Sequence, residues 1–174
     1  MKKILLCLLM VFTPAALAWD HVGHKLIGHI AYHHLNPKAK LMVDRLTMEP
    51  NHDYQPEARF LYISNWADWE RAKGNNQFNT WHYIDFPYAD VGFLAKPPET
   101  QNVVYGINHC VGILKQPARS STEQQTALKM LVHLVGDIHQ PFHNFSRYNF
   151  KHPGGDHGGN SYQIRSKTAS TLHA

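Results

Sequence analysis

A histidine and an aspartate lie four residues apart within an apolar stretch in the second half of the chain. Residues 122–138 have the apolar spacing of a helix, and Pro141 follows soon after its end. His133 and Asp137 then share one helix face. A carboxylate among apolar side chains is costly unless a cation or hydrogen-bond donors accompany it. The stretch therefore predicts a helix that ends beside a positive partner; the alternative is a hydrogen-bonded core histidine near a surface acid.

Three other short segments carry side chains that could converge on this helix end. His143 follows the proline turn closely enough to fold back toward it. Asp68 lies three residues before Arg71 on one predicted helix face, available to a metal ion and to a phosphate oxygen respectively, although such a pair is more often a surface ion pair. His82 and, near the start of the first predicted helix, His24 add further imidazoles. Imidazole nitrogens together with carboxylate oxygens are typical of zinc sites.

The amino terminus has the pattern of a secretory signal peptide. Two lysines precede an apolar run over residues 4–12, and small residues stand before a cleavage site after Ala18. The run is much shorter than the ~20 apolar residues that a spanning helix needs, so we expect a secreted or periplasmic protein without a membrane anchor. Processing would expose Trp19, whose amine and carbonyl could chelate a metal; the alternative is an ordinary disordered terminus. The chain then consists of a signal peptide, residues 1–18, and one domain, residues 19–174.

Composition restricts the interpretation further. The chain contains 14 histidines, which add little charge at pH 7. Loss of the two leader lysines takes 17 basic residues to 15 against 13 acidic ones, a charge near +2, which is too small to indicate nucleic-acid binding by itself. Only Cys110 remains after processing, so no disulfide can form within the chain. Bound metal could supply stability instead.

The hydrophobic pattern predicts a mainly α-helical chain with short extended segments. Strand-like alternation over residues 81–86 would put Tyr83 and Asp85 on one side and His82 on the other, and the proline that follows should end the segment. A glycine-rich loop and a hairpin are expected after Asn144. The predicted helices cover residues 21–35, 37–46, 59–73, 103–114 and 122–138.

Together these segments resemble one known family, the zinc-dependent single-strand-specific nucleases of fungi, plants and bacteria called S1/P1 nucleases. The resemblance covers residues 19–174, and its specificity comes from the order and combination of the motifs. These motifs are Trp19 with His24, Trp66-Ala67-Asp68 with Arg71, His82 before an extended acidic residue, and finally His133, Asp137 and His143.

The resemblance implies a centre of three zinc ions in a mainly α, multi-helix fold of the phospholipase C/nuclease type. The first zinc would be held by Asp68, His82, His133 and Asp137. The second would be held by the Trp19 amine and carbonyl, by His24 and, as a bridge, by Asp137. The third would be held by His143, His173 and an aspartate four residues after His173, a position beyond Ala174. We therefore expect the third site and the carboxyl-terminal helices of the family to be incomplete in this sequence.

The same resemblance implies a phosphodiesterase that cleaves single-stranded DNA and RNA to 5′-phosphate products and that also has 3′-nucleotidase activity. Asp68 would orient the attacking water, and Arg71 would neutralise charge on the phosphoryl oxygens. Tyr83 is expected to stack on an unpaired base and Asp85 to accept hydrogen bonds from its edge; ordinary strand packing is the alternative for both. Asn160, behind two glycines, is expected to reach a phosphate. We expect a monomer.

Two other functions stay open at this point. A phosphatidylcholine-type phospholipase C shares the helical fold, the three zinc ions and an amino-terminal tryptophan ligand, although Tyr83 and Asp85 after His82 favour nucleotides. A non-catalytic exported zinc-binding protein is also compatible, because the third site lacks its aspartate. The remaining histidines are not predicted to bind metal: His21, His29, His33, His34, His52, His109, His139, His152 and His157.

Overall fold

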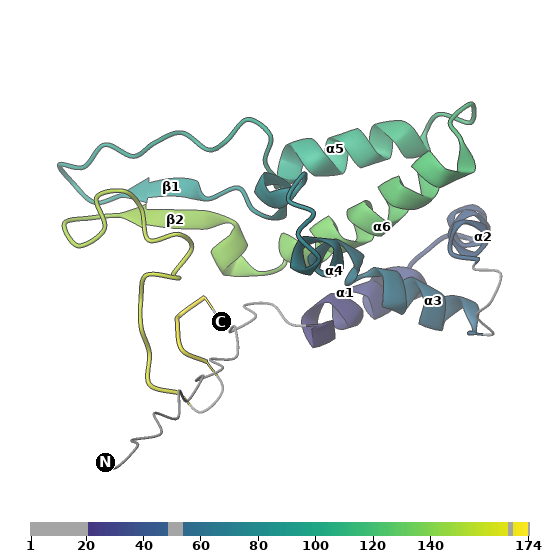
Figure 1. Ribbon diagram of the computed structural model, residues 1–174, viewed down its shortest axis with the longest axis horizontal. Coiled ribbons are helices and arrows are strands. Elements are labelled where there is room, and N and C mark those ends of the chain that lie inside the picture. Colours follow the sequence, from purple (N-terminus) through teal and green to yellow (C-terminus); the bar gives the residue numbers. More distant parts are fainter. Residues whose placement is uncertain (1–20, 49–53, 167–168, 174) are drawn as a thin grey trace, which may run out of the picture.

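The computed structural model describes residues 21–48, 54–166 and 169–173, and these are mainly helical, as the sequence predicts (Figure 1). The helices gather on one side, and a small two-stranded sheet lies on the other. Trp19 and the predicted signal peptide lie outside the described residues. No helix within the described ranges has the length and apolar character needed to cross a membrane. In chain order the elements are α1 (His21–His33), α2 (Pro37–Leu46), α3 (Pro56–Ile63), α4 (Trp66–Ala72), the 3₁₀ helix η1 (Asn79–His82), β1 (Phe86–Ala89), α5 (Val103–Leu114), α6 (Ser121–Asp137), the 3₁₀ helix η2 (Pro141–His143) and β2 (Phe145–Tyr148).

Helix α6 is the central element of the fold. Its start is fixed by a capping box, in which the Ser120 hydroxyl accepts from the backbone N–H of Glu123 and the Glu123 carboxylate accepts from the backbone N–H of Ser120. Leu128 belongs to a hydrophobic cluster shared with α1, α2 and α3, whereas Leu134 belongs to one shared with α4, α5 and η1. Because α6 is packed on both sides, its last turn is held firmly inside the molecule.

The single helix predicted over residues 59–73 is two helices in the structure. Helix α3 ends at Ile63 and α4 begins at Trp66. The Ser64 hydroxyl donates to the carbonyl of Leu61 at 2.7 Å, a local bond of the kind that competes with helix continuation. The backbone carbonyl of Ser64 accepts instead from a histidine of α6. The interruption therefore couples the α3–α4 junction to the central helix.

The prediction of an extended segment over residues 81–86 is wrong at its start. His82 ends the 3₁₀ helix η1, so its side chain is not positioned by strand alternation. The backbone is extended at Tyr83, but Asp85 has a φ of 48°, so the alternation predicted for these two residues is interrupted before β1 begins at Phe86. The reason is tertiary: Trp81 is buried in the cluster formed with α5 and α6, and that burial outweighs the local preference of an aromatic stretch for a strand.

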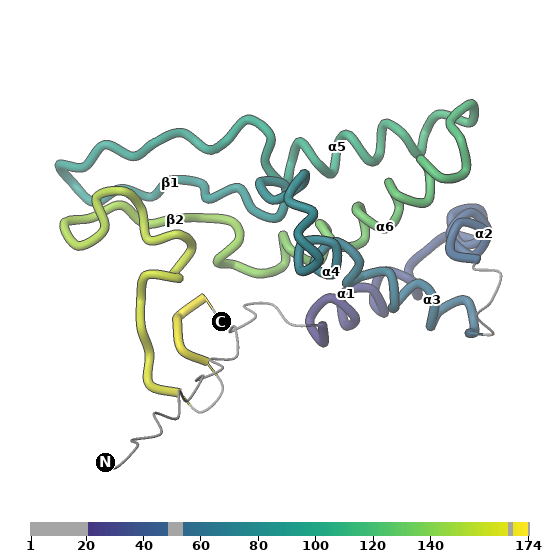
Figure 2. The backbone as a smooth tube through the Cα atoms, viewed as in Figure 1, coloured from purple at the N-terminus to yellow at the C-terminus, as the bar shows by residue number. Residues whose placement is uncertain are grey.

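The two strands, β1 and β2, pair in parallel. Phe86 stands opposite Phe145, and β1 and β2 run side by side although they are far apart in the sequence (Figures 1 and 2). Pro87 does not end β1, because the N–H groups that donate to the segment before β2 belong to Ile84 and Phe86. The N–H of Asp90 donates likewise to the Tyr148 carbonyl, so Pro87, between Phe86 and Asp90, costs no ladder bond. In place of the hairpin predicted after Asn144, the described residues that follow β2 form a single antiparallel bridge, between Gln163 and Thr171.

Candidate metal centre

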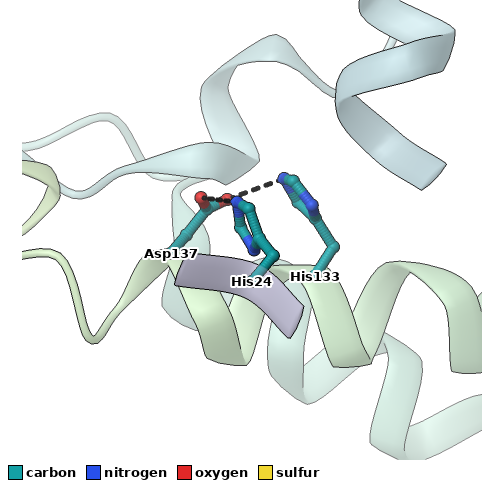
Figure 3. Close-up of side chains that lie close together, drawn as sticks. All are labelled: His24, His133 and Asp137. Atoms are coloured by element: carbon teal, nitrogen blue, oxygen red, sulfur yellow. Dashed lines mark ion pairs between the residues drawn. The ribbon is translucent and has the colours of Figure 1, made fainter. Parts of the chain in front are cut away.

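Histidines and aspartates from distant parts of the chain surround the carboxyl end of α6. His133 and Asp137 lie one turn apart on α6, and both are fully buried. His24 of α1 is equally buried and stacks on His133, with ring centroids 4.1 Å apart. Figure 3 shows the three side chains together, with the Asp137 carboxylate directed at both imidazole rings. The predicted helix end is therefore polar and enclosed.

Asp137 lies close to four histidines. Its Oδ2 is 3.1 Å from Nδ1 of His82 and 3.2 Å from Nε2 of His133. Its Oδ1 is 3.3 Å from Nδ1 of His143 and 3.5 Å from Nε2 of His24. Neither oxygen has a hydrogen-bond partner among the described residues. Nε2 of His133 and Nδ1 of His82 form a hydrogen bond of 3.0 Å with each other. Because buried polar atoms are rarely left unpaired, the two Asp137 oxygens fit a carboxylate that binds an ion.

The His24 imidazole is also without a hydrogen-bond partner at either nitrogen among the described residues. Its Nε2 lies 3.7 Å from Oδ2 of Asp68 and 3.5 Å from Oδ1 of Asp137. Burial and the neighbouring His133 lower the pKa of His24 to about 4, despite the opposing effect of Asp137. A neutral imidazole keeps a nitrogen lone pair available to a metal. His24 is thus suited to ligation at neutral pH.

Backbone carbonyls fix which nitrogen two of the histidines present. Nδ1 of His133 donates to the Ser64 carbonyl at 2.8 Å, and Nδ1 of His143 donates to the His82 carbonyl at 2.8 Å. Burial by itself would lower the pKa of His133, but Asp137 and the Ser64 carbonyl raise it overall. A carbonyl that accepts from the second ring nitrogen is the usual support of a metal-bound histidine. In His133 this leaves Nε2, the nitrogen beside Asp137, free to ligate. In His143 it also leaves Nε2, because the Nδ1 near Asp137 carries the proton donated to the His82 carbonyl.

Asp68 and His82 form a second group around His133. Oδ1 of Asp68 lies 3.8 Å from Nε2 of His133 and 3.9 Å from Nδ1 of His82. One ligand atom from each of these three residues lies within 4.8 Å of the others, as in the group of His24, His133 and Asp137. The Asp68 side chain is 37% exposed, unlike the other members, and Arg71 of the same helix is exposed. The cluster is thus enclosed by buried side chains except at α4, where Asp68 is open to solvent.

The two histidines predicted for a third metal site lie together. The rings of His143 and His173 stack with centroids 5.1 Å apart, and Nδ1 of His173 donates to the Gly158 carbonyl at 2.6 Å. Burial lowers the pKa of His173. Gly158 has a φ of 58°, and a Cβ there would lie 2.0 Å from the Phe142 carbonyl oxygen. Only glycine fits this approach, which explains the glycines that precede Asn160.

The residues predicted to bind substrate have different surroundings. Tyr83 and Asp85 are both half-buried; burial and the Asp85 charge raise the pKa of Tyr83, and burial also raises that of Asp85 against the charges of His157 and His143. Asp85 has a φ of 48°, a strained conformation for a residue other than glycine. Asn160 is exposed, and its amide donates to the backbone carbonyl of His157 at 2.8 Å, within its own loop. Of these three residues, Asp85 is therefore the one with an electrostatic link to the histidine cluster, through His143.

Two residues that shape this centre were not identified from the sequence. Ser64 acts through its carbonyl, which any residue would supply, so no sequence signal exists for it. Gly136 lies inside α6, and a Cβ there would be 2.3 Å from Nδ1 of His24. A glycine inside a helix costs about 1 kcal/mol relative to alanine. A glycine at this position of a predicted helix therefore indicates that another part of the chain packs closely against it.

His24 predicts how the metal-free chain responds to acid. Its pKa is about 4 in the folded chain against 6.5 in the unfolded one, so the unfolded chain binds more protons between these values. Stability should therefore fall as the pH decreases from about 6.5 to about 4, by about 3 kcal/mol in total. The raised pKa of His133 affects stability in a different pH range: its contribution is lost as the pH rises above 6.5. Urea unfolding of chelator-treated protein at several pH values should show this loss in the wild type and a flatter profile in His24→Gln; equal profiles would exclude it.

Comparisons with known proteins identify a family and several relatives to which this chain is similar. A family model described as S1/P1 Nuclease matches residues 19–174. Nuclease S1 of Aspergillus oryzae is 24% identical over an alignment of 138 residues that covers 72% of this chain and 44% of that protein. Nuclease P1 of Penicillium citrinum is 25% identical over an alignment of 139 residues that covers 72% of this chain and 47% of that protein. The chain thus spans a little under half the length of these curated relatives.

Proposed function

Since the chain belongs to the S1/P1 nuclease family, we propose that it is an exported, zinc-dependent phosphodiesterase that cleaves single-stranded DNA and RNA to 5′-phosphate products, with 3′-nucleotidase activity. The observation that carries this proposal is the environment of Asp137. A buried carboxylate that lies within 3.5 Å of nitrogens from four histidines, without a hydrogen-bond partner among the described residues, fits a ligand shared between metal ions.

The donor set fits zinc, which prefers imidazole nitrogen and carboxylate oxygen. When bound, zinc supplies Lewis acidity at phosphate oxygens and makes water a stronger acid. We propose three ions, as the family resemblance implies. Asp68, His82, His133 and Asp137 would hold the first; His24, Asp137 and the amino terminus at Trp19 the second; His143 and His173, with a further ligand, the third.

Asp68 and Arg71 are the residues proposed to act on the scissile phosphate. The Asp68 carboxylate is partly exposed at the open side of the cluster, where it can accept a hydrogen bond from the attacking water and orient it. Arg71 follows three residues later on α4 and is exposed. Its positive charge partly counteracts the rise in the pKa of the half-buried Tyr83, which supports a place for Arg71 near the proposed base-stacking residue. A guanidinium there can bind two phosphoryl oxygens as their charge grows.

Preference for unpaired strands would come from Tyr83 and Asp85. A base must leave its stack to reach a side chain beside the metals, and single strands allow this at low cost. The half-buried Tyr83 ring offers a stacking surface, and the Asp85 carboxylate can accept hydrogen bonds from a base edge. Asn160 is the proposed contact to a neighbouring phosphate.

Hydrolysis assays on the chain that begins at Trp19 test the proposal. We expect release of acid-soluble nucleotides from denatured DNA and from RNA, slower release from duplex DNA, loss of activity with a chelator and recovery with zinc. Hydrolysis of a choline phospholipid without action on RNA would instead assign a phospholipase C. Zinc binding without hydrolysis of either substrate would reduce the chain to a zinc-binding protein.

A further inference from the structure

A second group of metal-binding side chains lies on the surface, at the contact between α1 and α3. His29 and His33 lie four residues apart on α1, and Glu57 lies in the first turn of α3. Oε1 of Glu57 is 2.6 Å from Nδ1 of His29 and 3.2 Å from Nε2 of His33. One ligand atom from each residue lies within 4.8 Å of the others. Three ligand atoms from two helices therefore face one point.

The chemistry of this group is that of an open zinc site. Two histidines four apart on a helix, completed by a carboxylate, form a known zinc-binding pattern. Zinc bonds of about 2.0–2.1 Å in a tetrahedron hold neighbouring ligand atoms roughly 3.3 Å apart, a spacing that small side-chain rotations would give. The side chains of His29, His33 and Glu57 are 52%, 57% and 33% exposed. Water can thus reach the remaining coordination position.

The charge of the group also suits a divalent cation. The hydrogen bond with His29 and, to a smaller extent, the proximity of His33 lower the pKa of Glu57, so its carboxylate is ionised at neutral pH. The same oxygen contacts both imidazoles. A cation bound between this oxygen and the two imidazole nitrogens would replace the two hydrogen bonds. It would leave all three side chains close to their present positions.

We propose that His29, His33 and Glu57 form a solvent-open zinc site, separate from the buried centre, that ties α1 to α3. The proposal differs from the sequence interpretation, in which neither histidine is a ligand. The two helices pack closely, since a Cβ at Gly28 would lie 3.3 Å from Leu61. Helix α1 carries His24, and α3 leads directly into Ser64, whose carbonyl orients His133. An ion bound only by the folded chain would therefore stabilise the framework of the buried centre.

Zinc titration of the full chain, followed by calorimetry, tests the site. We expect the His29→Gln/His33→Gln double variant to bind one zinc ion fewer per chain than the wild type, and Glu57→Gln to bind that ion at least tenfold more weakly. His34→Gln is the matched control, because His34 is an exposed histidine adjacent to the site but outside the group. The three histidines are exposed and Glu57 is half-buried without a place in the hydrophobic clusters, so circular dichroism should be unchanged. The comparison between variants is independent of how many ions the buried centre holds and of any nuclease activity.

Thermal unfolding gives a second readout. Zinc added in excess should raise the Tm of the wild type and of His34→Gln by more than it raises the Tm of the double variant. Equal stoichiometry and equal zinc-dependent Tm in the wild type and the double variant would overturn the proposal. So would loss of the same ion in His34→Gln, because it would indicate unspecific binding to surface histidines.

Discussion

Asp137→Asn is expected to remove zinc from the buried centre and to lower the proposed hydrolysis by more than about 100-fold, since loss of an outer partner alone costs a metal site about 10- to 100-fold. The substitution keeps the shape of the side chain but removes the negative charge that faces His24, His82, His133 and His143. It also replaces one oxygen by an amide group, which donates hydrogen bonds and cannot ligate. Zinc analysis of the purified protein and nuclease assays measure both effects.

Asp44→Asn is the matched control for this experiment. Asp44 is also a partly enclosed helical carboxylate, which accepts from the Tyr32 hydroxyl at 2.8 Å and pairs with Lys40 at 3.0 Å. It has no contact with the histidine cluster among the described residues. The variant should keep its zinc and its activity while losing about 1 kcal/mol of stability at most. Wild-type zinc content in Asp137→Asn would contradict the shared-ligand role of Asp137.

Apolar periodicity and capping residues predict most of the helical framework. Helices α2 and α5 have the predicted limits, because Pro37 and the apolar spacing act locally. The errors occur where distant residues decide the outcome. Ser64 interrupts a periodic stretch because its carbonyl bonds to α6, and Trp81 enters a 3₁₀ helix because α5 and α6 bury it. Neither partner can be recognised from the local sequence.

The candidate site is predictable where its residues share an element and unpredictable where they do not. The spacing of His133 and Asp137 places them together on any helix. Convergence with His24 and Asp68 came from the resemblance to a family, and the structure brings these side chains within 4 Å of one another. The surface group was missed for the same reason, since Glu57 follows His33 by 24 residues and only tertiary packing joins them.

Gly136→Ala is expected to destabilise the folded chain. Helix propensity alone predicts the opposite sign, so the measured change in stability tells whether the helix or its tertiary contacts decide the effect. In an isolated helix Gly136→Ala would stabilise α6 by about 1 kcal/mol. In the folded chain the new methyl group would lie 2.3 Å from Nδ1 of His24, which is itself fully buried. The ring must therefore move out of its place against His133. We expect a net loss of about 1–3 kcal/mol from overpacking, together with loss of the metal bound by His24 and of most activity.

Gly112→Ala is the control that makes this result interpretable. Gly112 lies inside α5, and a Cβ there would meet no atom within 4 Å. That variant should gain about 0.5–1 kcal/mol from helix propensity alone, with unchanged zinc content. Urea unfolding and zinc analysis of both variants measure the contrast. If Gly136→Ala were as stable as Gly112→Ala and kept its zinc, His24 would not be held against α6 as the structure has it, and its role as a ligand would have to be abandoned.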